Sequence, residues 1–268
     1  MSTNLMSLAR SGGKFLKLFG DRKMMKTMPT ARDYVQDGLV AMWDGIENAA
    51  WGIHDANATV WKNLVGTEDM VLNQSFEYDI YNDSMLFRDD NRSGSRASSQ
   101  MSITMTEDMT IEGMMLIPNV KPVWDVRMCI GLLYSEKTGV FPFARGVTYI
   151  PSLKYSASYN DNSDRYFRNP KVGETVSSSI VFRRAAKSFD GYYNGEVVST
   201  IGSQDDNWLG DNIVLHPVFI HKQFSDTMIG CDFRINYMRI YSRALTAEEI
   251  AHNYEIDKAR FNLTTPTI

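Results

Sequence analysis

The sequence predicts an all-β fold, an antiparallel sandwich or barrel with one short C-terminal helix and an N-terminal arm. Short β-type runs follow one another from Asp37 onward between polar turn clusters, and no alternating helical segments separate them, as a parallel α/β sheet would require. Asn194-Gly195 is the clearest hairpin signal, because both central positions of a type I′ turn need positive φ. The expected strands are 39–43, 101–105, 109–117, 126–134, 176–182, 213–220 and 233–241.

One helix has a strong local signal near the end of the chain. Thr246 followed three residues later by Glu249 forms a capping box, and Leu245 with Ile250 can form the hydrophobic staple across it. These features predict a helix over about 247–260 that closes the domain.

Composition is that of a folded protein with a sizeable core. The chain has 268 residues, of which 43% are hydrophobic and 22% charged. No apolar run approaches the roughly 18 residues of a membrane-spanning helix, and the run 15–19 is too short for a signal-peptide core, so we expect neither a membrane span nor an export signal. Cys129 and Cys231 lie far apart and are most simply two buried thiols.

Charge divides the chain into a basic arm and an acidic body. The first 30 residues carry six Lys or Arg and one Asp, a net charge of +5 in a chain of net charge −4, so the remainder carries −9. An acidic body argues against nucleic-acid binding by the main domain, whereas the arm favours an acidic protein, a membrane surface or nucleic acid, with a solvated tail as the alternative. We expect an arm over 1–33, a domain over 34–262 and a tail over 263–268.

The arm has a weak helical stripe of apolar positions that Gly12-Gly13 interrupts. A helix with this break is not stable alone, so we expect the arm to become ordered only against a partner surface and to act as an anchor. The expected anchoring residues are Lys14, Phe15, Lys17, Leu18 and Phe19.

Four segments share a pattern and an order with a known superfamily. Residues 38–44 read GLVAMWD, 110–115 read TIEGMM, 192–198 read YYNGEVV and 238–250 read MRIYSRALTAEEI. They resemble the opening strand, central strand, hairpin and closing strand with helix of the concanavalin A-like lectin/glucanase superfamily, in particular the laminin-G-like domains of bacterial and phage proteins. The resemblance covers about 35–260 and implies a jelly-roll β-sandwich. It leaves function open, because this fold carries lectins, hydrolases, receptors and structural modules.

A catalytic carboxylate pair is incomplete in this sequence. Glycosidases with this sandwich carry a Glu-x-Asp-x-Glu type strand, because one carboxylate attacks while another protonates the leaving oxygen. Glu77, Asp79, Tyr81 and Asp83 share one face of an expected strand, but Tyr81 stands where the second Glu should be. The sequence therefore predicts a solvated strand face and no enzyme activity.

Metal binding is expected, if at all, at oxygen-rich loops. His216 and His221 are five residues apart on an expected strand, which places them on opposite faces. Calcium prefers six to eight oxygen ligands, but ordinary turns are also rich in Asn and Asp, so no cofactor is required and Ca²⁺ is one possibility. The candidate groups are Asp205, Asp206, Asn207, Asp211 and Asn212, and Asn160, Asp161, Asn162 and Asp164.

Sugar binding needs an exposed aromatic plate with polar neighbours. Trp208 has this setting, because it lies beside Asp206, Asn207 and Asp211, and it is the best single ligand-binding candidate. The alternative is a loop tryptophan folded back onto the sandwich, since large aromatic side chains are usually mostly buried.

The other tryptophans divide by local context. Trp51 and Trp124 lie in loop-like stretches and are weaker ligand-binding candidates. Trp43 and Trp61 lie in apolar, strand-like stretches, which predicts that they belong to the core.

The function most consistent with these features is a non-catalytic recognition and assembly module. Its jelly roll would present loops to a glycan or a protein, and its arm would anchor it in a larger, oligomeric assembly. The resemblance to phage proteins, together with the absence of an export signal, favours a virion structural or decoration protein made in the bacterial cytoplasm and carried outside on the virion surface. A glycan hydrolase with a diverged acid pair and a cytoplasmic scaffold are the alternatives.

Overall fold

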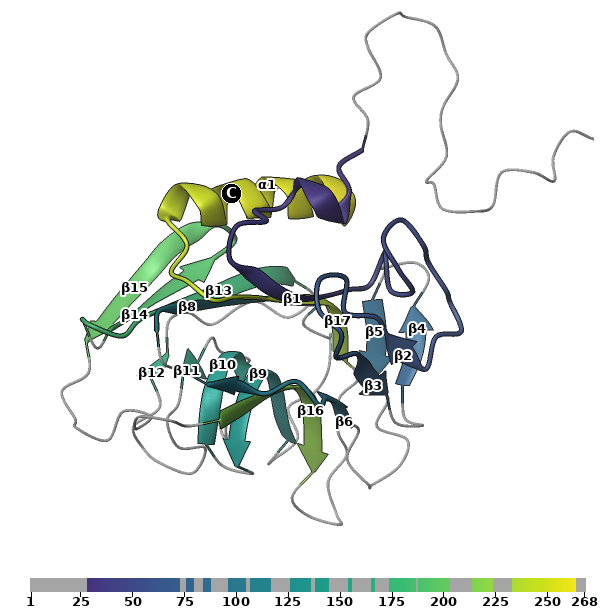
Figure 1. Cartoon of the computed structure of the whole chain (residues 1–268), viewed down its shortest axis with the longest axis horizontal. Coiled ribbons are helices and arrows are strands. Elements are labelled where there is room, and N and C mark those ends of the chain that lie inside the picture. The colour runs from purple at the N-terminus through teal and green to yellow at the C-terminus, as the bar shows by residue number, and fades with distance from the viewer. Residues whose placement is uncertain are drawn as a thin grey trace, which may run out of the picture.

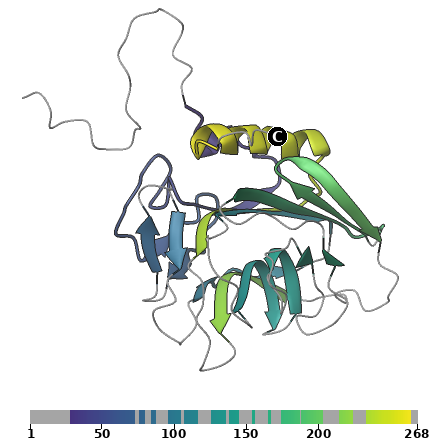
Figure 2. The ribbon, with the colours of Figure 1, turned by 180° about the vertical axis from the view of Figure 1, so that it is seen from behind.

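The computed structural model shows two antiparallel sheets packed face to face. Within the residues described below, one α-helix lies on the outer side of the first sheet, so the fold has three layers (Figure 1). The view from behind shows the same order of layers (Figure 2). This is the all-β sandwich with one C-terminal helix that the sequence predicts. The structure describes residues 28–72, 76–79, 84–87, 96–104, 107–116, 126–135, 138–144, 154–155, 165–166, 174–186, 188–202, 214–223 and 233–263.

The first sheet contains eight strands in the described part of the chain, in the order β15-β14-β13-β8-β17-β5-β4, with β1 also paired to β17. Asn194 and Gly195 join β14 to β15 and have φ of 51° and 82°, the positive values that the predicted hairpin turn needs. The strands are β1 (Leu39–Asp44), β4 (Phe76–Asp79), β5 (Ser84–Phe87), β8 (Met109–Leu116), β13 (Thr175–Arg183), β14 (Ser188–Tyr193), β15 (Glu196–Gly202) and β17 (Phe233–Tyr241).

The second sheet contains seven strands within the described ranges, in the order β10-β9-β16-β6-β3-β2, with β7 also paired to β16. A two-stranded ladder of β11 and β12 completes the pairing among these residues. The strands are β2 (Val60–Trp61), β3 (Met70–Leu72), β6 (Arg96–Ser99), β7 (Ile103–Thr104), β9 (Val126–Ser135), β10 (Thr138–Ala144), β11 (Lys154–Tyr155), β12 (Arg165–Tyr166) and β16 (Val214–Gln223).

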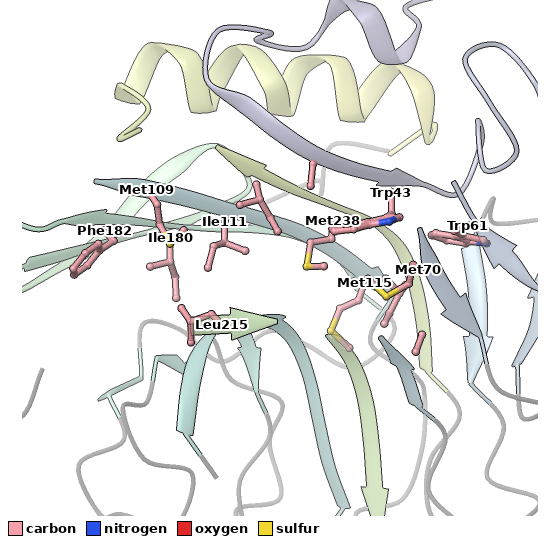
Figure 3. Packing of buried hydrophobic residues seen from close by; sticks show 14 of the residues in the cluster. Trp43, Trp61, Met70, Met109, Ile111, Met115, Ile180, Phe182, Leu215 and Met238 are labelled. Carbon is pink, nitrogen blue, oxygen red and sulfur yellow. The ribbon is translucent and has the colours of Figure 1, made fainter. Parts of the chain in front are cut away.

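The main core lies between the two sheets (Figure 3). Alternate residues of each strand point to one face, so Ile111 of β8 and Met238 of β17 face the second sheet and join one cluster with Leu215 of β16. Trp43 and Trp61 belong to the same cluster and are 0% and 1% exposed. The prediction that these two tryptophans form part of the core is confirmed.

The helix α1 (Ala247–Arg260) begins at the predicted capping box. The Thr246 hydroxyl accepts a hydrogen bond from the Glu249 backbone N–H at 3.2 Å, and the Glu249 carboxylate accepts one from the Thr246 N–H at 2.9 Å. Leu245 and Ile250 are buried in one apolar cluster on the outer face of the first sheet. No helix in the described part of the chain is long and apolar enough to span a membrane.

Residues 31–33, just before the expected domain boundary at residue 34, pack against the rest of the fold. A short 3₁₀ helix, η1 (Ala31–Asp33), starts after Thr30, and Ala31 is fully buried. The Val35 N–H donates to Asn253 Oδ1 of α1 at 3.0 Å, so this segment is fixed to the C-terminal helix. Residues 31–33, which the sequence analysis includes in the arm, therefore contact the rest of the fold in the structure. The expected anchoring residues Lys14, Phe15, Lys17, Leu18 and Phe19, like the tail 264–268, lie outside the described residues.

Candidate recognition site

Charged side chains lie between the first sheet and α1. Strand alternation turns Glu112 of β8 and Arg239 of β17 toward the helix, because their neighbours Ile111 and Ile240 face the core. Arg239 Nε donates to Glu112 Oε2 at 2.8 Å, and its two Nη atoms donate to the Asp257 carboxylate of α1 at 3.0 and 3.2 Å. One strand arginine thus holds a carboxylate from the sheet and another from the helix.

Tyrosine side chains enclose this arginine. The guanidinium carbon of Arg239 lies 3.9 Å from the ring centroids of both Tyr34 and Tyr237. The Tyr34 hydroxyl donates to Asp257 Oδ1 at 2.8 Å, and the Tyr237 hydroxyl donates to Asp257 Oδ2. The rings exclude water from the ion pairs while their hydroxyl groups satisfy the carboxylate.

A second arginine connects α1 to the end of β1. Arg260 Nη1 and Nη2 donate to the two oxygens of Asp44 at 2.6 and 3.0 Å, and Nη2 also donates to Glu47 Oε1 at 3.0 Å. Arg260 Nη1 further donates to the Tyr34 hydroxyl at 3.1 Å, which links the two arginine centres. We call the six charged side chains the buried ion network: Asp44, Glu47, Glu112, Arg239, Asp257 and Arg260.

The buried ion network is closed to solvent, because each member is less than a tenth exposed. Burial raises the pKa of the Glu112 carboxyl, although the charge of Arg239 opposes this shift. Burial also raises the pKa values of Tyr34 and Tyr237 well above their usual range, which keeps both hydroxyl groups protonated. The network is therefore a structural connection between helix and sheet and offers no open site to a substrate.

Glu47 extends the network to the surface. The Asp44 carboxylate accepts the N–H groups of Ile46 and Glu47 at 2.9 Å each, which turns the chain out of β1. Glu47 Oε1 accepts the Ala31 N–H at 2.7 Å, and Oε2 accepts the Gly52 N–H at 2.7 Å. A single buried carboxylate thus joins the ion network, the first residue of η1 and a surface turn.

That surface turn, Ala50–Ile53, is here called the Trp51 turn. Its ends form a β-bridge in which the Ile53 N–H donates to the Ala50 carbonyl at 2.9 Å. Gly52 has φ of 69°, a value that favours glycine, and a Cβ built there would have no atom within 4 Å, so the tip faces open space. Ile53 is 55% exposed, whereas Trp51 is half-buried against the outer apolar cluster.

Arg32 of η1 lies over the Trp51 ring. Its guanidinium carbon is 4.4 Å from the ring centroid, within the range of a cation–π interaction. Arg32 is exposed, as are Gly52 and Ile53. We call Arg32, Trp51, Gly52 and Ile53 the recognition surface. It combines a cation from η1 with an aromatic ring and an aliphatic side chain from the Trp51 turn, the chemistry by which a protein binds a polar ligand with apolar faces.

Of the three loop tryptophans proposed as ligand-binding residues, the structure describes Trp51. The acidic loop around Trp208, the second acidic loop and Trp124 lie outside the described residues, so their predicted roles stay predictions. Those residues are Trp124, Asn160, Asp161, Asn162, Asp164, Asp205, Asp206, Asn207, Trp208, Asp211 and Asn212.

Few of the metal and catalytic candidates fall within the described residues. No group of three His, Cys, Asp or Glu side chains among the described residues could hold a metal ion. His216 lies on β16 with His221, and its Nδ1 is 3.0 Å from the Met101 carbonyl oxygen. Glu77 and Asp79 lie on β4 at one edge of the first sheet. Tyr81, Asp83 and Cys231 fall outside the described residues, and Cys129 lies on β9.

Sequence reasoning missed Arg32 and Glu47. Gly52 directly after Trp51 indicates a turn, and this signal could have strengthened the prediction of Trp51 as a ligand-binding residue. No sequence signal pairs Arg32 with a tryptophan 19 positions later, because this contact depends on how η1 packs against the loop.

The comparisons with known proteins show the fold. No protein-family model and no curated protein matches the sequence. One similar structure is of botulinum neurotoxin type C, whose cell entry depends on interaction with two ganglioside molecules. It has a TM-score of 0.59 at 11% sequence identity, and the match covers 83% of this chain and 51% of the toxin chain. The binding domain of botulinum neurotoxin DC, solved in complex with rat synaptotagmin II, has a TM-score of 0.59 at 11% identity, with coverage of 84% and 53%.

Trypanosoma rangeli sialidase is also similar, with a TM-score of 0.55 at 14% identity and coverage of 87% of this chain and 34% of its own. This chain therefore spans about half of the toxin chains and about a third of the sialidase chain. At these identities the likeness establishes a shared β-sandwich architecture.

Proposed function

We propose that this chain is a non-catalytic binding module that recognises a glycan with the recognition surface. The observation that carries the proposal is the pair of exposed Arg32 and half-buried Trp51, whose turn Glu47 fixes to the buried ion network. An aromatic ring packs against the apolar face of a sugar, and a neighbouring cation donates hydrogen bonds to its oxygens.

The contacts that hold the Trp51 turn in place favour ligand binding. A surface that is ordered before the ligand arrives loses less conformational entropy on association. The Gly52 N–H is held by the Glu47 carboxylate, and Trp51 packs with its inner side against buried residues. The recognition surface is thus already arranged in the free protein.

The similar structures support a binding role. Among them are a toxin whose cell entry depends on interaction with gangliosides and a toxin binding domain solved in complex with rat synaptotagmin II. Function is not fixed by fold, so these similarities support the proposal and the site geometry carries it.

The basic arm supplies the second half of the proposed function. Its charge of +5 would attach the module to an acidic or apolar groove of a larger assembly, such as a phage particle. The described chain starts at Met28, four residues before Arg32, so the attachment and the recognition surface belong to adjacent parts of the sequence.

The test is a glycan array that includes neutral and acidic sugars, probed with the wild-type chain and with Trp51→Ala and Trp208→Ala variants. We expect Trp51→Ala to lose the array signal and Trp208→Ala to keep it, with thermal melting as a check that both variants fold. An unchanged array profile for folded Trp51→Ala, or no glycan bound by the wild-type chain, would contradict the proposal.

A further inference from the structure

Arg32 is an exposed arginine without a carboxylate partner among the described residues. The adjacent Asp33 is engaged by Thr30, whose N–H and hydroxyl donate to Asp33 Oδ2 at 2.6 and 3.0 Å. These bonds hold the pKa of the Asp33 carboxyl below its usual value, so the group stays ionised and bound to the cap. The nearby Glu47 carboxylate is likewise committed, to Ala31, Gly52 and Arg260.

Four other arginines in the described part of the chain have acidic partners: Arg183, Arg239, Arg243 and Arg260. Arg183 pairs with Asp190 at 2.8 Å, and Arg243 pairs with Glu249 at 2.6 Å. Arg32 instead rests on an aromatic ring, an arrangement that holds the cation in place while leaving its N–H groups available. An arginine positioned in this way is suited to receive an anion from solution, with little ordering cost when the ligand arrives.

The covered ring face also limits which sugars fit. A neutral sugar that stacks on the face occupied by Arg32 must first displace the guanidinium, whereas an anionic sugar can bind to the guanidinium where it lies. Ile53, which belongs to the same turn as Trp51 and is exposed, offers an apolar surface for the rest of the sugar.

We propose that the Arg32–Trp51 pair binds the carboxylate of an acidic sugar, which deepens the proposed function and rests on it. Two guanidinium N–H groups donate to the two carboxylate oxygens, Trp51 holds the guanidinium in place, and the apolar side of the sugar lies against Ile53. Guanidinium and carboxylate match in this geometry, and such charge-assisted pairs are stronger than neutral hydrogen bonds.

The experiment measures binding of sialyllactose, its methyl ester and lactose to the full-length protein by calorimetry. The ester keeps the sugar and removes the charge, so it isolates the carboxylate. We expect sialyllactose to bind at least about tenfold more tightly than either neutral sugar. Arg32→Gln should remove this difference, and Arg32→Lys should restore only part of it because lysine lacks the planar two-donor edge.

Lys62→Gln is the matched control, because Lys62 is also an exposed cation but pairs with Asp69 at 2.6 Å. It removes the same charge, and we expect it to bind sialyllactose like the wild-type protein. Equal affinity for sialyllactose and its ester, or an equal loss in Lys62→Gln and Arg32→Gln, would overturn the proposal. A pentaglutamate peptide that binds more tightly than sialyllactose would overturn the assignment to a sugar.

The two proposals fail in different ways. If all three sugars bind equally and Trp51→Ala abolishes binding, the acidic-sugar proposal fails and the glycan-binding function stands. If no sugar on the array or in solution binds, the proposed function itself fails.

Discussion

At the scale of residues, the unusual feature is a set of ionised groups under the last helix. Isolated buried charges are strongly destabilising, but here each arginine contacts two carboxylates and the remaining oxygens accept hydrogen bonds. Glu112 illustrates the balance, because Arg239 and Asn253 both donate to its Oε2, at 2.8 and 3.0 Å. Desolvation remains the largest influence on its pKa, which is raised from the ordinary value of 4.5.

The raised pKa of Glu112 predicts a pH dependence of stability. The folded state holds the Glu112 proton more tightly than the unfolded state does, so this group's contribution to stability falls as pH rises from about 4.5 through the raised pKa. The measurement is urea unfolding of the wild-type protein and Glu112→Gln over a pH series. The free energy of unfolding of the wild type relative to the variant should fall with rising pH, and a rise would contradict the account.

Glu249 provides a control for this prediction, because its contribution to stability should change with pH in the opposite direction to that of Glu112. The hydrogen bonds from Arg243 lower the pKa of the Glu249 carboxyl, so its contribution to stability is present above about pH 4.5 and is lost as pH falls through the lowered pKa. The stability of the wild type relative to Glu249→Gln should therefore increase as pH rises toward 4.5 and then level off.

At the scale of elements, the helix α1 begins where its local sequence specifies. The reciprocal bonds between Thr246 and Glu249 satisfy two N–H groups that a helix start leaves without partners. Arg243 adds a two-point contact with Glu249 at 2.8 and 2.6 Å. Ile250, which is 2% exposed, anchors the same turn on the outer face of the first sheet.

Changes at this helix start should lower stability by different amounts. Thr246→Ala removes the cap and should cost about 1 kcal/mol of unfolding free energy. Ile250→Ala leaves a cavity under the helix and should cost about 2 to 5 kcal/mol. Denaturant unfolding with both variants tests this, and wild-type stability in either variant would show that α1 does not depend on its first turn.

The elements that sequence reasoning predicted are those with local signals. The Asn194-Gly195 turn and the Thr246 cap involve residues within a few positions of one another, and strand alternation separates the core face from the outer face. The packing of η1 could not be predicted, because Tyr34 meets Asp257 across 223 positions and no short-range pattern encodes that meeting. The contact between Arg32 and Trp51 depends on the same packing, so no local pattern in the sequence indicates it.

At the scale of the whole molecule, the first described residues and the last helix are joined. Tyr34 donates to Asp257 and accepts from Arg260, while the His252 ring contacts the Asp33 carbonyl oxygen at 3.0 Å. The sandwich therefore needs the residues from about Thr30 onward, because Ala31 and Tyr34 are buried in it.

Two truncated proteins separate the arm from the fold. A chain that begins at Met28 should melt at the temperature of the full chain, because it keeps Ala31, Tyr34 and the other described residues that pack on α1. A chain that begins at Gly38 loses Ala31 and Tyr34 and should be less stable by at least about 3 kcal/mol. Thermal melting distinguishes them, and destabilisation on removal of residues 1–27 would mean that the arm belongs to the core.

The central claim, that ligand is recognised at the Trp51 turn, is tested most directly with the indole N–H signals of the five tryptophans. Single tryptophan-to-phenylalanine variants assign the five NMR signals, and sialyllactose is then titrated into ¹⁵N-tryptophan-labelled protein. The account predicts that the Trp51 signal moves with saturation while the buried Trp43 and Trp61 signals stay in place. Movement of the Trp208 or Trp124 signal with an unmoved Trp51 signal would contradict it.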